Sequence, residues 1–397
     1  MNTRFISAAC TASLLLAGCG STPAGDAGVG ADAASDAPVI SADASLPESF
    51  RTPVAPAFTS TTSDPRTIQV SISGEADAVN GFDYNANPGD GERVVVDGWQ
   101  LRFSRVITTI ARVRLNRPST TPTDPAAVGA DVFTSPAIFA VNVAKAGPLV
   151  VGGDTAIPLT VISAPAGGGS LDPMVRYAFS FDTAPASPAA TNVNLDAADV
   201  TAYEEMLRKG WTWLIEGTAN YRGAAPGAGT SFESYPTTVR FRFGFGADAR
   251  YLNCNNPDNG DESPGVAPNP SRAVTAQITL HVDHFLWGAL GVEDPPLRFD
   301  QFASRARAMG DAAEVTLDDL VGVAPTNLRD RMNRTVPDRG GQTAGYTPRN
   351  PDALSFDLGG NTGVADLRDF VAFSHRASGH LNSEGLCAVR PSGAFRY

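Results

Sequence analysis

The sequence predicts a mainly β protein, an antiparallel β-sandwich with a helical, loop-rich C-terminal portion packed against it. Several stretches alternate apolar and polar residues with period two, which is typical of strands that bury one face. Gly and Pro, with 39 and 30 copies in 397 residues, cluster between these stretches as they do in the turns of antiparallel sheets. Most of the helical signals follow Pro295.

The alternation is clearest where aromatic residues repeat. Val175, Tyr177, Phe179 and Phe181 fall on one face of a strand, and the polar residues between them fall on the other. The same pattern predicts strands over residues 67–73, 99–103, 106–115, 138–143, 157–162, 174–183, 211–221, 237–246 and 274–282.

Helices are predicted where a capping residue precedes a segment whose apolar residues repeat about every 3.6 positions. Asp196 is a suitable N-cap and Gly210 a suitable end for a helix over 197–209. Further helical segments are expected over 299–309, in a short turn that Thr316 caps, and over 364–377 with Gly379 at its end.

The first eighteen residues predict a signal peptide. Arg4 supplies the positive charge, and residues 5–17 are apolar but too short for a permanent membrane span. The motif Leu16-Ala17-Gly18-Cys19 resembles the lipobox of bacterial lipoproteins. This resemblance implies cleavage before Cys19 and attachment of lipid to its thiol. An ordinary signal peptide that contains a cysteine is the alternative.

The lipobox resemblance also implies a location. Gly20 and Ser21 follow the cysteine, where Asp would favour retention in the inner membrane. We therefore expect an outer-membrane lipoprotein, periplasmic or surface-exposed, whose membrane contact is the N-terminal lipid. Residues 19–63 are rich in Ala, Asp, Gly, Ser and Pro and predict a disordered tether. Beyond it we expect a β-sandwich body over 64–290 and an α-containing portion over 291–397.

Charge and cysteine usage restrict the partners and the compartment. The formal net charge of −12 argues against nucleic acid as a partner, and no protein partner can be named. Cys10 would leave with the signal peptide and Cys19 would carry lipid, so Cys254 and Cys387 remain as a pair in an oxidising compartment. We predict a disulfide between them, with two separate buried thiols as the alternative.

All four histidines fall in two short segments, 281–284 and 375–380. His281 and His284 flank Asp283 in the first segment, and His375 and His380 lie in the second. Neutral imidazole is a common ligand of Zn and Cu, and Asp283 could bind the ion or orient a ring. A disulfide between Cys254 and Cys387 would hold the two segments close together. The sequence therefore predicts a transition-metal site of His281, Asp283, His284, His375 and His380.

Other interpretations of the histidines stay open. They could have scattered structural roles, with His375 simply capping a helix, or form a metal-free binding or proton-transfer site. A structural or adhesive surface lipoprotein without metal suits the tether equally. A metal-dependent hydrolase would need a nearby base, for which Asp300 and Asp366 are candidates. No catalytic spacing is recognisable, so no catalytic residue is assigned.

From about Gly74 onward the chain resembles a family of predicted bacterial lipoproteins of unknown function. The segments that carry the likeness are Val96-Asp97-Gly98-Trp99, 175–182, His281-Val282-Asp283-His284 and Gly379-His380-Leu381-Asn382. The family supplies no activity and no catalytic residues. This sequence has Phe285 where the family pattern would place Pro after the second histidine of the first segment.

Overall fold

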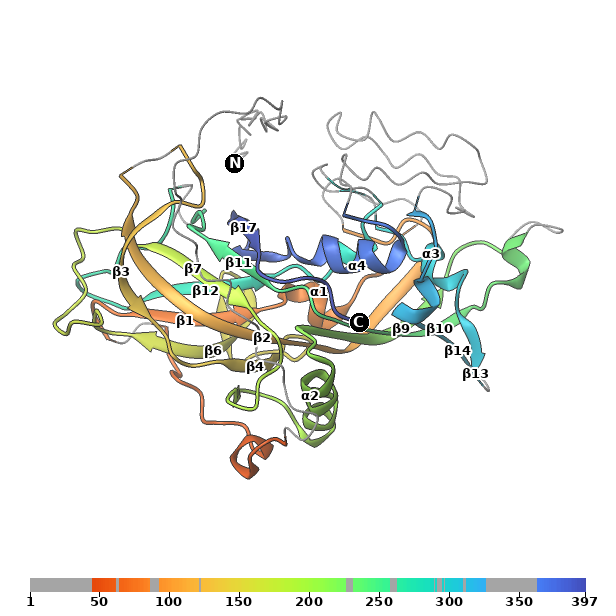
Figure 1. The fold of residues 1–397 in the computed structure, drawn as a ribbon, viewed down its shortest axis with the longest axis horizontal. Helices are drawn as coiled ribbons and strands as arrows, with labels where there is room; N and C mark the ends of the chain where they lie inside the picture. Colours follow the sequence, from red (N-terminus) through yellow and green to blue (C-terminus); the bar gives the residue numbers. More distant parts are fainter. Residues whose placement is uncertain are drawn as a thin grey trace, which may run out of the picture. The chain divides into compact units, whose positions relative to one another are not determined.

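The computed structural model describes residues 45–61, 64–85, 93–120, 123–225, 231–257, 263–288, 290, 295, 297–309, 312–325 and 363–397 (Figure 1). The described residues all belong to one unit by their contacts. The expected signal peptide, Cys19 and the tether up to residue 44 lie outside the described residues. None of the described helices has the length and apolar character needed to cross a bilayer.

The mainly β class is confirmed, since the described strands assemble into two large sheets. The first sheet has six strands in the order β16 (Gly385–Leu386), β15 (Gly379–Leu381), β12 (Val274–Leu280), β1 (Ile68–Ser73), β6 (Asp154–Ile162) and β5 (Leu149–Val151). Most neighbours are antiparallel, but β1 and β12 run parallel. β1 is buried along its whole length, and parallel pairs are typically covered on both faces.

The second sheet is larger and carries three branch strands. Its main path is β13 (Arg307–Met309), β14 (Ala312–Thr316), β10 (Thr238–Phe245), β9 (Trp213–Tyr221), β2 (Trp99–Pro118), β7 (Ala178–Thr183), β11 (Ala249–Leu252) and β17 (Ala388–Pro391). β3 (Val128–Thr134) and β4 (Phe139–Asn142) also pair with β2, and β8 (Thr191–Asn192) pairs with β4. The pairs β10–β14 and β4–β8 are parallel.

The longest strand, β2, joins two segments that the sequence pattern separates. Its pairing register shifts between Phe103 and Arg105 opposite β9, and between Ala111 and Arg114 opposite β7. Arg112 has a φ of 46° at the second shift. Such bulges insert residues and bend a strand, so the period-two alternation breaks although the strand continues.

The main core lies between the two sheets, and two helices cover opposite sides. Val70 and Ile278 of the first sheet share one apolar cluster with Phe181 and Trp213 of the second. Helix α4 (Leu367–His375) packs into this cluster, whereas α2 (Ala197–Lys209) packs into a separate cluster with Leu214. Trp213 and Leu214 are consecutive residues of β9, so the two helices lie on opposite sides of this strand (Figure 1).

The predicted helices are confirmed in part. α2 has the predicted bounds, with Asp196 accepting hydrogen bonds from Ala198 and Asp199 and with Gly210 in the left-handed region. The helix expected over 299–309 is wrong beyond α3 (Asp300–Ala303), because β13 pairs there with β14. α4 is shorter than expected and ends before Gly379, which belongs to β15.

The end of the expected tether is folded. Leu46 and Phe50 are buried in the cluster that α2 forms, and the Phe50 ring stacks on Tyr203 with centroids 4.9 Å apart. Asn192 donates a side-chain hydrogen bond of 2.8 Å to the carbonyl oxygen of Phe50. The expected boundary at residue 63 is therefore too late, because apolar side chains in this segment find a partner surface on α2.

The C-terminal portion is part of both sheets. β13, β14 and β17 belong to the second sheet, and β15 and β16 belong to the first. Between β16 and β17, Cys387 forms the predicted disulfide with Cys254, which follows β11. This bond joins parts of the chain separated by 133 residues.

Candidate metal centre

Sheet register brings His281 next to His380. His380 lies in β15 directly opposite Thr279 of β12. His281 follows two residues after Thr279, and its backbone N–H donates to the carbonyl oxygen of Ser378, which continues the antiparallel ladder. Residues two apart share a face of a strand, so the two imidazoles are diagonal neighbours on one face.

His284 approaches the same pair because β12 ends first. The strand stops at Leu280, and a 3₁₀ turn over His284–Leu286 redirects the chain. The Nδ1 atom of His284 lies 3.0 Å from the carbonyl oxygen of Ser374 in α4. A carbonyl only accepts, so Nδ1 carries the proton and Nε2 keeps the free lone pair. A backbone contact of this kind orients histidine ligands in metal sites.

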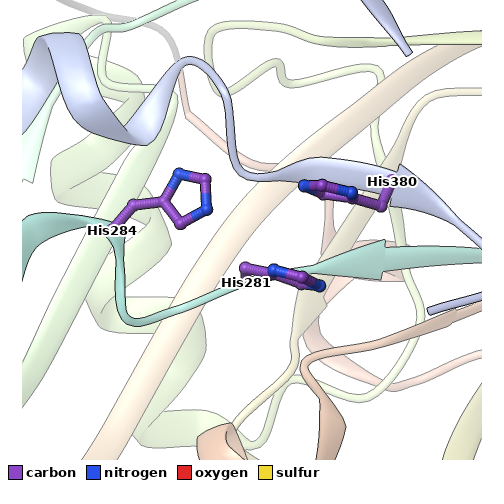
Figure 2. A group of neighbouring side chains, drawn as sticks. All are labelled: His281, His284 and His380. Carbon is purple, nitrogen blue, oxygen red and sulfur yellow. The ribbon is translucent and has the colours of Figure 1, made fainter. Parts of the chain in front are cut away.

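The three rings form a compact buried group. His281 and His380 are stacked, with centroids 4.1 Å apart and planes inclined by 6° (Figure 2). The His284 ring lies beside this pair, 5.8 Å from His281 and 6.3 Å from His380 (Figure 2). One nitrogen from each ring lies within 4.8 Å of the other two, and all three residues are at most 8% exposed.

His375 does not join this group. Its ring is 6.5 Å from that of His284 and is packed edge-on against Trp213 and Phe245, with centroids 4.5 and 5.6 Å away. Neither ring nitrogen has a hydrogen-bond partner among the described residues. His375 is the last residue of α4, and at this position of the helix its side chain faces the apolar core. The predicted role of His375 as a ligand is therefore wrong in this structure.

Asp283 lies near the group without joining it. Its Oδ2 accepts hydrogen bonds of 3.0 Å from Arg93 and 3.1 Å from Trp287. The Trp287 ring in turn contacts His284, with centroids 3.7 Å apart. Asp283 is predicted either to bind the ion or to orient a ring. It takes the second role indirectly, since it holds the Trp287 ring that packs on His284.

Burial keeps two of the imidazoles, those of His284 and His380, neutral. Burial, together with repulsion from His281, lowers the pKa of His380 to about 3. Burial and repulsion from the other histidines also hold the pKa of His284 well below its usual value. Only neutral imidazole has a lone pair for a metal, so these two rings are ready to bind an ion at neutral pH.

Carboxylates gather around His281, which the sequence did not predict. The Glu75 Oε2 atom lies 3.6 Å from His281 Nε2. Burial raises the pKa of Glu75, and burial together with repulsion from Asp283 raises the pKa of Asp77 to about 6. Glu75 has a φ of 59°, a conformation that is unfavourable for a residue with a side chain and is often found at functional sites. It lies 206 residues before His281, so no local pattern could have revealed it.

The donor set fits one transition-metal ion after a small adjustment. Zn–N bonds of about 2.0 Å in a tetrahedral site require nitrogen atoms roughly 3.3 Å apart. The lone pairs of the two stacked rings lie in nearly parallel planes, because a lone pair lies in the plane of its ring. One of the two rings must turn about its side-chain torsions to face a shared ion.

The two acids considered as hydrolytic bases have structural partners. Asp300 accepts a 2.8 Å hydrogen bond from Trp99 Nε1, and Asp366 caps α4 by accepting from the backbone of Asp369 and from Gly322.

Comparisons of the chain with protein-family models, curated proteins and solved structures returned no match. The function must therefore be argued from the site itself.

Proposed function

We propose that this protein is a lipid-anchored extracytoplasmic protein that binds one transition-metal ion, Zn or Cu, through His281, His284 and His380. The observation that carries the proposal is the approach of three buried imidazole nitrogens to within 4.8 Å of one another. Imidazole suits Zn and Cu, and the neutral rings of His284 and His380 carry no charge that would oppose a cation. The nearby carboxylates make the surroundings favourable for positive charge.

Binding is favoured over hydrolysis as the role of the ion. All three ligands are buried, and an enclosed site is typical of structural or carrier metals, whereas a catalytic metal keeps an open position for water and substrate. Asp300 and Asp366 serve other contacts. Glu75 lies on the Nε2 side of His281, which leaves Nδ1 of that ring to bind the ion with the other two histidines.

Metal analysis of the purified protein tests the site. After expression with zinc and copper supplied and gel filtration to remove weakly bound metal, we expect about one equivalent of tightly bound metal in the wild type and less than a tenth in His281→Ala, His284→Ala or His380→Ala. His375→Leu is the matched control, because it removes a buried histidine outside the group and should keep the metal. Copper should also quench the emission of Trp287, whose ring contacts His284. Less than half an equivalent in the wild type would refute the site.

The lipid anchor is a separate part of the proposal. It rests on the lipobox motif at Leu16–Cys19. Replacement of Cys19 by Ser should move the protein from the membrane fraction to the soluble fraction and abolish incorporation of labelled palmitate. Cys10→Ser is the control, since this cysteine lies within the cleaved segment and should leave both unchanged. A Cys19→Ser protein that still sediments with membranes would contradict the anchor.

A further inference from the structure

We infer that a second divalent metal ion binds beside the first, held by Glu75, His281 and Glu384. This inference rests on the proposed three-histidine site, with which it shares His281. One ligand atom from each of the three residues lies within 4.8 Å of the other two. The set comes from three distant parts of the chain: the start of α1 (Glu75–Asn80), the end of β12, and the turn after β15.

His281 supplies an independent sign of a ligand at this position. The residue is 5% exposed, and its Nε2 atom has no hydrogen-bond partner among the described residues. A buried polar nitrogen without a partner is unfavourable. This atom is on the side of Glu75, whose Oε2 lies 3.6 Å away. An ion between the two would satisfy both.

The other contacts of Glu75 hold its carboxylate in place. Ser383 Oγ donates a 2.9 Å hydrogen bond to Glu75 Oε1, which leaves Oε2 directed at the imidazole. The Glu75 backbone N–H donates to Ser73 Oγ at 2.8 Å, which supports its left-handed backbone. Ser383 is adjacent to Glu384, so the same turn that fixes Glu75 also presents the third ligand.

The charge around this position favours a cation. Glu75 interacts with Glu384 and Asp154, and the neighbouring Asp77 interacts with Asp283. Arg93 is the guanidinium group that acts on Asp77, and it also donates a hydrogen bond to Asp283. Carboxylates that crowd together with little compensating charge repel one another, and a divalent ion would relieve this repulsion.

The two positions differ in access to solvent. Glu384 is exposed and lines a cleft of about 900 Å³ together with Asn382, Ser383 and Gln277. The second position therefore opens to solvent, whereas the first is enclosed. We expect the second ion to bind more weakly and exchange faster than the first. When both nitrogens of His281 bind metal, the ring proton is released to solvent, so binding of the second ion releases one proton.

A zinc titration of the full-length, detergent-solubilised protein against a chelating indicator tests this arrangement. We expect two equivalents in the wild type, one at least tenfold weaker than the other. Glu384→Gln should lose the weaker equivalent and keep the tighter one. The control is Glu48→Gln, which removes a 91% exposed acid outside both groups and should keep both equivalents. The exposed position of Glu384 makes its replacement safe for folding, and the melting temperature of each variant verifies this.

The outcomes separate the two proposals. One equivalent in the wild type that survives Glu384→Gln but is lost in His284→Ala overturns the second position and keeps the first. One equivalent that is lost in Glu384→Gln but survives His284→Ala supports the second position and overturns the first. If the wild type binds one equivalent and both variants lose it, the two groups form one mixed site, and the inference is overturned. If Glu384→Gln still binds two equivalents, the inference is also overturned.

Discussion

Burial without a polar partner determines the protonation of His375. The side chain is fully buried, and desolvation lowers its pKa to about 3, whereas in the unfolded chain the pKa is close to 6.5. Above pH 6.5 this residue is neutral in both the folded and the unfolded state, so its titration does not lower the free energy of unfolding there. As the pH falls from 6.5 toward 3, only the unfolded state binds the proton, so the free energy of unfolding decreases by about 1.4 kcal/mol per pH unit.

Replacement of His375 by Leu should remove this acid sensitivity. The variant keeps an apolar side chain between Trp213 and Phe245 and has no proton to bind. Urea unfolding of the metal-free proteins at pH 7, 6 and 5 measures the effect. We expect the stability of the variant to decrease less steeply with falling pH than that of the wild type. Equal slopes for the two proteins would show that the His375 ring is already protonated, or solvated, in the folded state.

At the scale of elements, the close approach of β15 to the core positions His380. A Cβ atom on Gly379 would lie 2.5 Å from a ring carbon of Tyr251, and that ring is fully buried and stacked on Phe181. Gly379→Ala should therefore push β15 away from β12, lower the free energy of unfolding by about 1–3 kcal/mol, and weaken zinc binding at least tenfold. Gly167→Ala is the control, because nothing lies within 4 Å of its Cβ position. Unchanged zinc affinity in Gly379→Ala would show that the position of β15 does not determine zinc binding.

The helices and strands also show which features of the fold and of the site can be predicted from the sequence. Alternation located most strands because each buries one face in a shared core, and the caps Asp196 and Gly210 located α2 because capping is local chemistry. The pairing of His281 with His380 could be expected only in part, since it depends on the β12–β15 register. The exclusion of His375 and the approach of Glu75 depend on packing between distant segments, which periodicity does not encode.

At the scale of the whole molecule, the disulfide fastens the two sheets to each other beside the site. Cys254 follows β11 of the second sheet, and Cys387 follows β16 of the first. Next to the bond, the Asn255 backbone N–H donates to Leu386, and Asn382 Nδ2 donates to Asn256 Oδ1. The segment that carries His380 is therefore anchored on both sides, by β12 through the ladder and by the second sheet through the covalent bond.

Removal of this bond should affect stability and metal binding together. The pair Cys254→Ser and Cys387→Ser frees a loop that spans 133 residues, which corresponds to a loss of about 4–5 kcal/mol on the chain-entropy model. The freed β15–β16 hairpin also holds His380 less firmly, so zinc should bind at least tenfold more weakly. Chemical denaturation and zinc titration of the variant, each compared with the wild type, measure the two effects. A variant that loses stability but binds zinc as tightly as the wild type would show that the ladder between β12 and β15 suffices to hold His380, and that the disulfide acts on the fold alone.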